Sequence, residues 1–102
     1  MNKKEAEKTY AKAFLAYLGE ENIEYSLGVA NMLRASGINT DMNLMQRNIT
    51  KQLEYVNSLN IKYTVIIGRN ERAINKLRLR NMLSGEESVL TLDEVISKIK
   101  SD

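Results

Sequence analysis

Runs of apolar or alternating residues predict five strands along this chain. Residues 11–18 and 63–67 are mostly apolar, β-branched or aromatic, and a glycine follows each run, which is typical of buried strands. The alanines of the first run would also permit a helix, but its short length favours a strand. Residues 38–44 and 76–81 alternate apolar with polar side chains, as expected of strands covered on one face. Residues 89–92 supply a fifth strand.

A long amphipathic helix is predicted between the first two strands, over residues 20–36. Acids open its first turn, Arg34 closes the last, and Gly37 can supply a left-handed cap. The apolar face of this helix is expected to comprise Ile23, Leu27, Ala30 and Leu33.

Two more helices have capping signals at their starts. Asn48 is expected to cap a helix that extends to about Leu59. Thr91 and Glu94 have the spacing of a capping box, which predicts a last helix. The apolar faces of these two helices are expected to be Ile49, Leu53 and Val56 in the first, and Val95, Ile96 and Ile99 in the second.

The order of these elements predicts an α/β fold with a mixed five-stranded sheet and about three helices. Strand-helix-strand units require parallel strands with right-handed crossovers, whereas a hairpin turn at residues 84–86 requires an antiparallel pair. A length of 102 residues with 43% hydrophobic side chains suits a single domain, which we assign to residues 10–102. Residues 1–9 are charged and lack an apolar stripe, so we expect a lead-in or linker remnant.

Composition narrows the chemistry. The chain has neither Cys nor His, which excludes disulfides and cysteine-ligated metals and removes the commonest general base. We therefore expect no metal and no cofactor. No apolar run is long enough for a membrane span, and the charged start is unlike a signal peptide, so we expect a soluble, cytoplasmic protein.

Cations gather in the second half of the chain, although the net charge is only +2. Between residues 69 and 80 one acid, Glu71, stands among five cations: Arg69, Arg72, Lys76, Arg78 and Arg80. The planar donors of Arg suit phosphates and guanine edges, and the unstacked bases of RNA loops are a natural target. The cations could instead keep an edge hairpin soluble, and the cluster taken alone favours that second interpretation. Glu86 and Glu87 lie at the predicted turn, so we expect both to be solvated.

A second polar group surrounds the start of the middle helix. It comprises Gln46, Arg47, Lys51 and Gln52. Free backbone N–H groups and the positive end of the helix dipole attract phosphate at such a position. An ordinary solvated helix start has the same appearance, and this group taken alone favours that interpretation.

The order of the motifs resembles a known family. It runs from Asp41 through Arg-Asn-Ile-Thr-Lys-Gln-Leu-Glu-Tyr at 47–55, Val-Ile-Ile-Gly-x-x-Glu at 65–71 and a basic strand ending at Arg80 to a Ser-Gly-Glu-Glu hairpin. This order is similar to the C-terminal anticodon-binding domain of class II aminoacyl-tRNA synthetases, most of all histidyl-tRNA synthetase. The resemblance covers residues 12–100.

The resemblance implies a three-layer anticodon-binding fold that recognises the anticodon stem-loop of a tRNA. By position, Gln46 and Arg47 would lie in the loop before the middle helix that contacts anticodon nucleotides. Glu71 would be a carboxylate acceptor for these nucleotides, and Arg80 would be the cation on the next strand that contacts them. Lys51 and Gln52 would support the loop or reach the RNA backbone. With the neighbouring cations, the predicted RNA-binding set is Gln46, Arg47, Lys51, Gln52, Arg69, Glu71, Arg78 and Arg80.

The resemblance also bears on catalysis and partners. The chain carries none of the class II catalytic motifs, so by itself it should activate no amino acid. We expect the catalytic domain of a parent synthetase as a partner, and a homodimer is a further expectation. The alternative is a protein-interaction or dimerisation module with the same fold, as in synthetase-like accessory or regulatory proteins.

Overall fold

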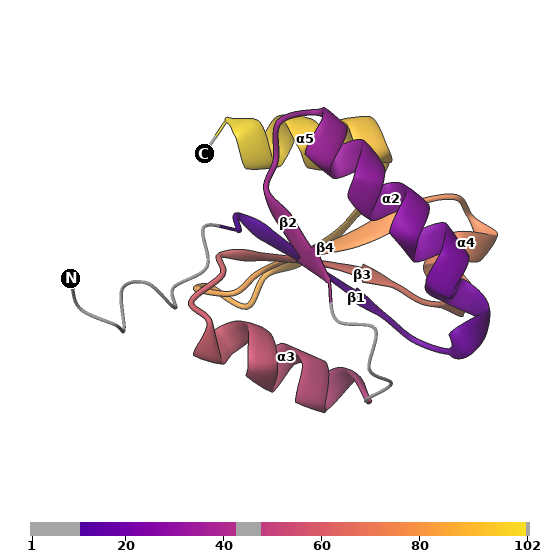
Figure 1. Ribbon diagram of the computed structural model, residues 1–102, viewed down its shortest axis with the longest axis horizontal. Coiled ribbons are helices and arrows are strands. Elements are labelled where there is room, and N and C mark those ends of the chain that lie inside the picture. Colours follow the sequence, from indigo (N-terminus) through magenta and orange to yellow (C-terminus); the bar gives the residue numbers. More distant parts are fainter. Residues whose placement is uncertain (1–10, 43–47, 102) are drawn as a thin grey trace.

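The computed structural model describes residues 11–42 and 48–101, and the expected lead-in at residues 1–9 lies outside them. Its helices and strands alternate along the first part of the chain and end in a hairpin and a helix (Figure 1). In chain order they are β1 Ala13–Tyr17, the 3₁₀ turn η1 Glu20–Asn22, α2 Ile23–Ala35, β2 Thr40–Met42, α3 Ile49–Ser58, β3 Tyr63–Ile67, α4 Arg69–Ala73, β4 Leu77–Asn81, β5 Glu87–Leu90 and α5 Leu92–Lys100. None of the helices within these ranges is long and apolar enough to cross a bilayer.

The five strands form one mixed sheet in the order β2-β1-β3-β4-β5. β1 pairs in parallel with β2 and β3, and Leu15 lies opposite Met42 on one side and Val65 on the other. β4 runs antiparallel to β3 and forms a hairpin with β5. This topology confirms the predicted mixed sheet with its parallel and antiparallel portions.

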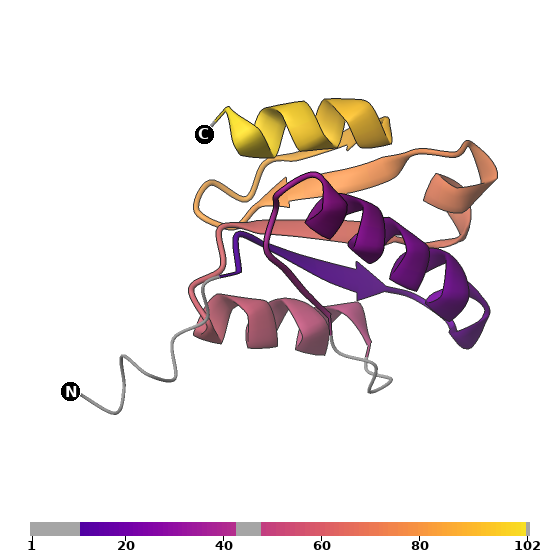
Figure 2. The same cartoon turned by 45° about the horizontal axis from the view of Figure 1, so that its top comes forward.

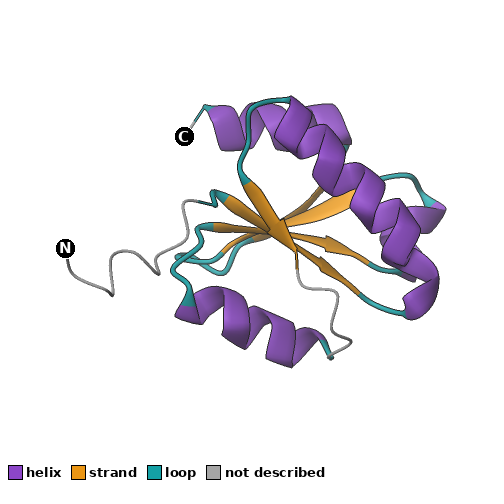
Figure 3. Ribbon diagram, in the orientation of Figure 1, coloured by secondary structure: helices purple, strands orange, loops and turns teal. Residues whose placement is uncertain are grey.

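Helices cover the two faces of the sheet unequally (Figures 2 and 3). α2 and α5 pack on one face, where the larger apolar core includes Leu15, Leu33, Val65 and Ile99. On the other face α3 packs mainly beside β1, and a smaller core includes Phe14 and Val56. Among the described residues no helix lies over β4 and β5 on the α3 side, and we call this the uncovered part of the sheet (Figures 2 and 3).

The local signals in the sequence produce these elements. β1 and β3 are buried at every position, because both are central and apolar. The Asn48 side chain accepts a hydrogen bond from the Lys51 backbone N–H at 2.8 Å, and so caps α3 as predicted. Gly37 has φ +91°, the left-handed conformation expected of the cap that ends α2.

Four details of the predicted elements differ in the structure. The helix expected over residues 20–36 begins with the 3₁₀ turn η1, and α2 extends from Ile23 to Ala35. Leu27 is exposed, and the buried face of α2 instead includes Ser26 and Val29 beside Ala30 and Leu33. The fifth strand begins at Glu87 and ends at Leu90, since Thr91 already caps α5. α4 was not predicted, because five residues are too few to show an apolar period. Of the strand expected over 38–44, the structure describes β2, and Asn43 and Leu44 lie outside the described residues.

Candidate nucleic-acid interface

An open groove of about 700 Å³ lies between α3 and the uncovered part of the sheet. Its apolar lining comes from four side chains on β3, on α3 and just after β1. Its polar lining comes from η1, α4, β4 and β5. The apolar residues are Leu18, Ile49, Leu53 and Ile66, and the polar ones include Arg69, Asn70, Glu71, Arg78 and Glu87. The groove lies at the carboxyl ends of the parallel strands β1 and β3, where open α/β sheets commonly bind ligands.

The turn after β3 is built tightly around Gly68. A Cβ atom at this position would lie 3.0 Å from Glu71 Oε1 and 3.1 Å from Leu18 Cδ1, so a larger residue would push both side chains away. The Gly68 N–H donates to Glu71 Oε1 at 2.9 Å. The glycine thus lets the backbone hold the Glu71 carboxylate against the groove.

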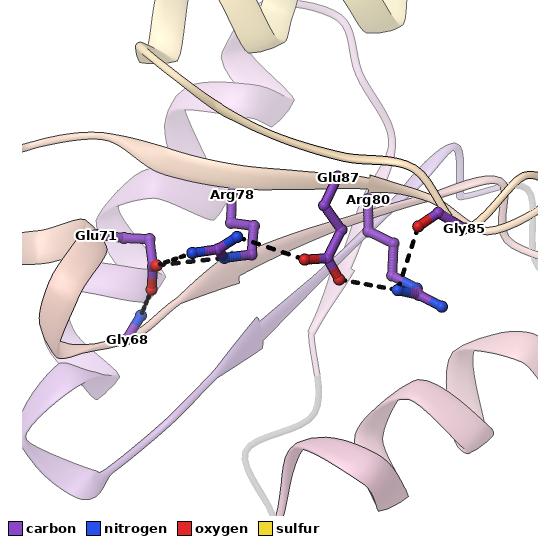
Figure 4. Close-up of polar contacts among 6 residues, drawn as sticks. All are labelled: Gly68, Glu71, Arg78, Arg80, Gly85 and Glu87. Atoms are coloured by element: carbon purple, nitrogen blue, oxygen red, sulfur yellow. Dashed lines mark hydrogen bonds and ion pairs between the residues drawn. The ribbon is translucent and has the colours of Figure 1, made fainter.

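Four charged side chains form a continuous row on the uncovered face (Figure 4). Arg78 donates to Glu71 Oε2 through Nη2 at 3.0 Å and through Nε at 3.3 Å. On its other side Arg78 Nη1 lies 3.4 Å from Glu87 Oε1, and Arg80 Nη1 donates to Glu87 Oε2 at 2.8 Å. We call Glu71, Arg78, Glu87 and Arg80 the charged row.

The charged row bears on two expectations, and the role of Glu71 as an acceptor for RNA stays a prediction. Glu87 is not merely solvated, because both of its carboxylate oxygens accept from arginines. Glu71 is buried and occupied by Gly68 and Arg78, so it is not a free acceptor in the unbound protein. Glu87 lies directly opposite Arg80 in the β4–β5 register. Counting outward from Ser84-Gly85 would have placed Arg80 opposite Val89, so this favourable pair of opposite charges becomes visible only in the observed strand register.

Gln52 has a structural position inside the protein. Its side chain is 4% exposed, its Oε1 accepts from the Tyr17 N–H at 3.1 Å, and its Nε2 donates to the Tyr17 carbonyl at 2.8 Å. In the described residues β2 pairs with β1 as far as Leu15, and Gln52 bonds the backbone two residues further along β1 as a neighbouring strand would. These bonds fix α3 to β1, and the roles expected for Gln52, supporting the loop or reaching the RNA backbone, stay predictions.

The remaining predicted residues fall into different environments. Lys51 is exposed and lies 3.7 Å from Glu54 on the same helix. Arg69 is exposed beside the groove and has no ion pair within the described part of the chain. Gln46 and Arg47 lie outside the described residues.

Arg72, another member of the cation cluster, is used for internal contacts. Its Nη1 donates to the Glu21 carbonyl at 2.8 Å, and its guanidinium lies 5.2 Å from the centre of the Tyr25 ring. Arg72 therefore joins α4 to the start of α2. The five cations that are neighbours in sequence thus divide into structural, paired and exposed groups.

The groove has the chemistry of a surface that binds planar polar groups. An apolar lining can contact the face of a ring, and the charged row presents hydrogen-bond donors and acceptors to its edge. Within residues 11–42 and 48–101, no three Asp, Glu, His or Cys side chains gather in a way that could hold a metal ion.

Comparisons with known proteins decide the family. A family model described as an anticodon binding domain matches residues 12–102. The chain belongs to the anticodon-binding-domain family.

Relatives of this anticodon-binding domain include many histidine–tRNA ligases. The enzyme from Caldanaerobacter subterraneus subsp. tengcongensis is 38% identical over 88 residues, which is 86% of this chain and 21% of that protein. The enzyme from Methanosarcina acetivorans is 45% identical over 71 residues, which is 70% of this chain and 17% of that protein. The chain therefore spans about a fifth of the length of the curated relatives it matches.

Solved structures agree with this assignment. Histidyl-tRNA synthetase from Nostoc sp. PCC 7120 aligns with a TM-score of 0.87 at 30% identity, over 91% of this chain and 22% of that chain. The RNA binding domain of threonyl-tRNA synthetase from Cryptosporidium parvum Iowa II aligns with a TM-score of 0.84 at 27% identity, over 89% of this chain and 23% of that chain. The anticodon-binding-domain fold is therefore confirmed.

Proposed function

We propose that this anticodon-binding domain recognises the anticodon of a histidine tRNA as part of a histidine–tRNA ligase. The groove carries this proposal, because it brings an apolar lining from α3 and β3 next to the charged row, on the side of β4 and β5 that no described helix covers. The identity to histidine–tRNA ligases supports the choice of tRNA.

Binding would use the groove in two ways. A base splayed out of the anticodon loop would place its ring against Leu53 and Ile66 and its edge against Arg78. Exposed cations outside the row, such as Arg69 at the groove, would contact phosphates and supply most of the salt-dependent affinity. Recognition and attraction would then rest on different side chains.

The catalytic domain of a synthetase is the protein partner we propose. Amino-acid activation and transfer to tRNA would belong to that domain, because the chain corresponds to about a fifth of the related ligases. A homodimer stays a prediction, which sedimentation equilibrium over a range of protein concentrations tests.

Binding of RNA hairpins tests the anticodon proposal. Two hairpins share one stem, and one carries a histidine anticodon while the other carries the same loop bases in scrambled order. We expect tighter binding of the anticodon hairpin, and we expect Arg78→Ala to reduce this preference more than Lys98→Ala. Lys98→Ala is the control, because it also removes one positive charge but lies on α5, which covers the opposite face.

Two results would contradict the proposal. Equal affinity for both hairpins would remove the anticodon assignment while leaving general RNA binding. A stable dimer that binds neither hairpin would favour the protein-interaction alternative.

A further inference from the structure

Glu87 occupies a central position in the charged row. It is the acid that contacts both arginines, with one carboxylate oxygen for each: Oε1 for Arg78 at 3.4 Å and Oε2 for Arg80 at 2.8 Å. It lies opposite Arg80 across the hairpin and diagonal to Arg78. One side chain on β5 therefore sets the spacing of two arginines on β4 (Figure 4).

The row is electrically balanced, since two arginines alternate with two glutamates. The side chains of Arg78, Arg80 and Glu87 are only 35%, 30% and 31% exposed, so their mutual attraction is less screened than that of fully solvated pairs. A phosphate would have to displace Glu87 to neutralise either arginine. A base edge would not, because each guanidinium has five N–H donors and the row uses only some of them.

The contacts of Arg80 indicate that Glu87 determines the orientation of the Arg80 side chain. The Nε atom of Arg80 is buried and has no hydrogen-bond partner in the described structure. A buried donor without an acceptor is unfavourable, so other contacts must hold this side chain in place. The shortest of its polar contacts is the 2.8 Å bond to Glu87, whereas the contact of Nη1 with the Gly85 carbonyl is 3.5 Å.

We propose that Glu87 is a positioning residue that fixes Arg78 and Arg80 for base edges and keeps them from binding phosphates. Glu87 itself need not touch RNA. It increases the preference for the correct loop at the cost of overall affinity. This inference rests on the proposed anticodon recognition and adds the residue that determines its selectivity.

The test compares Glu87→Gln with Glu86→Gln. Both variants remove one negative charge from the same hairpin, but the Glu86 side chain is exposed and has no arginine partner in the described structure. The affinities of the wild type and both variants are measured for the anticodon and scrambled hairpins over a series of salt concentrations. The NMR signals of the arginine Nε–H groups report whether Arg78 and Arg80 lose their fixed orientation.

The expected result is specific to position 87. Glu87→Gln should bind the scrambled hairpin more tightly than Glu86→Gln does. The slope of log affinity against log salt should become steeper by about 0.7 for each arginine released to a phosphate. The preference for the anticodon hairpin should fall about five-fold or more. In Glu87→Asp the side chain keeps its charge but is too short to reach both arginines. This variant should lose the preference for the anticodon hairpin without a steeper slope of log affinity against log salt.

Three outcomes would overturn the inference. If the two Gln variants have the same preference and slope, Glu87 acts only through its charge. If Glu87→Gln weakens binding to both hairpins equally, its role is to support the fold. If the wild type has no preference between the hairpins, the proposed function fails and the inference fails with it.

Discussion

The two faces of the sheet differ in the completeness of their helical cover, and the difference separates stability from recognition. On the face covered by α2 and α5, the side chains of β1, β3 and β4 are apolar and buried. On the α3 face, β4 instead carries Arg78 and Arg80 beside an open groove. One strand thus contributes Leu77 and Leu79 to the core and two arginines to the candidate interface.

Truncation of one leucine on each face should give the largest contrast. Leu33 is fully buried in the larger core, so Leu33→Ala should lower the free energy of unfolding by about 2–5 kcal/mol. Leu53 is half-buried in the groove lining, and Leu53→Ala should lower it by about 1 kcal/mol while weakening hairpin binding. Denaturant unfolding followed by circular dichroism measures the free energy of unfolding of both variants. Similar losses at both positions would mean that the two faces contribute equally to stability.

The next effect concerns the contact that fixes α3 to the sheet. Gln52→Ala leaves the Tyr17 N–H and carbonyl without their carboxamide partner, which should lower the free energy of unfolding by about 1–3 kcal/mol. Asn57→Ala on the exposed side of the same helix is the control and should change it by less than about 0.5 kcal/mol. Hydrogen exchange at the Tyr17 amide should also become faster in Gln52→Ala alone.

Arg69 and Arg80 provide a comparison within the α3 side. Arg69 has no described ion pair, so Arg69→Ala should lower the affinity for both RNA hairpins by the same factor. It should also reduce the slope of log affinity against log salt concentration by about 0.7. Arg80 is held by Glu87, so Arg80→Ala should reduce the preference for the anticodon hairpin with a smaller change in slope. If both variants reduced the slope equally, paired and exposed arginines would have the same role.

The smallest effect belongs to the covered face and depends on pH. The backbone N–H of Thr91 donates to Glu94 at 2.8 Å, and this bond, followed by that with the Thr91 side chain, holds the pKa of Glu94 below its ordinary value. A lowered pKa in the folded state means that ionised Glu94 stabilises the fold above the ordinary glutamate pKa. This stabilisation is lost as the pH falls through the lowered value. The unfolding free energies of the wild type and Glu94→Gln should therefore converge in acid, whereas parallel pH profiles would contradict this role.

Much of the fold could be predicted from local signals. Continuous apolar runs identified β1 and β3, Asn48 and Thr91 identified helix starts, and Gly37 identified a helix end, because each signal acts within a few residues. α4 and the exposure of Leu27 could not be predicted in the same way. The first is too short for a period, and the second depends on which side of α2 faces the sheet.

The candidate site was less predictable because it depends on contacts between elements. The position of Arg78 and Arg80 on one side of β4 follows from alternation, but their neutralisation by Glu87 requires the register of a second strand. The internal role of Gln52 depends on the position of α3 beside the end of β1, which no local pattern in the sequence specifies. A count of charges along the sequence therefore overestimated how many cations are available to a ligand.

The paired hydrogen bonds between Gln52 and Tyr17 also affect how the groove can respond to a ligand. They join the middle of α3 to the end of β1, so the helix that carries Ile49 and Leu53 cannot rock away without breaking both. One wall of the groove is thereby pre-organised. An incoming RNA loop would lose its own conformational freedom on binding but would not have to order this helix, which favours rapid association with a rigid surface.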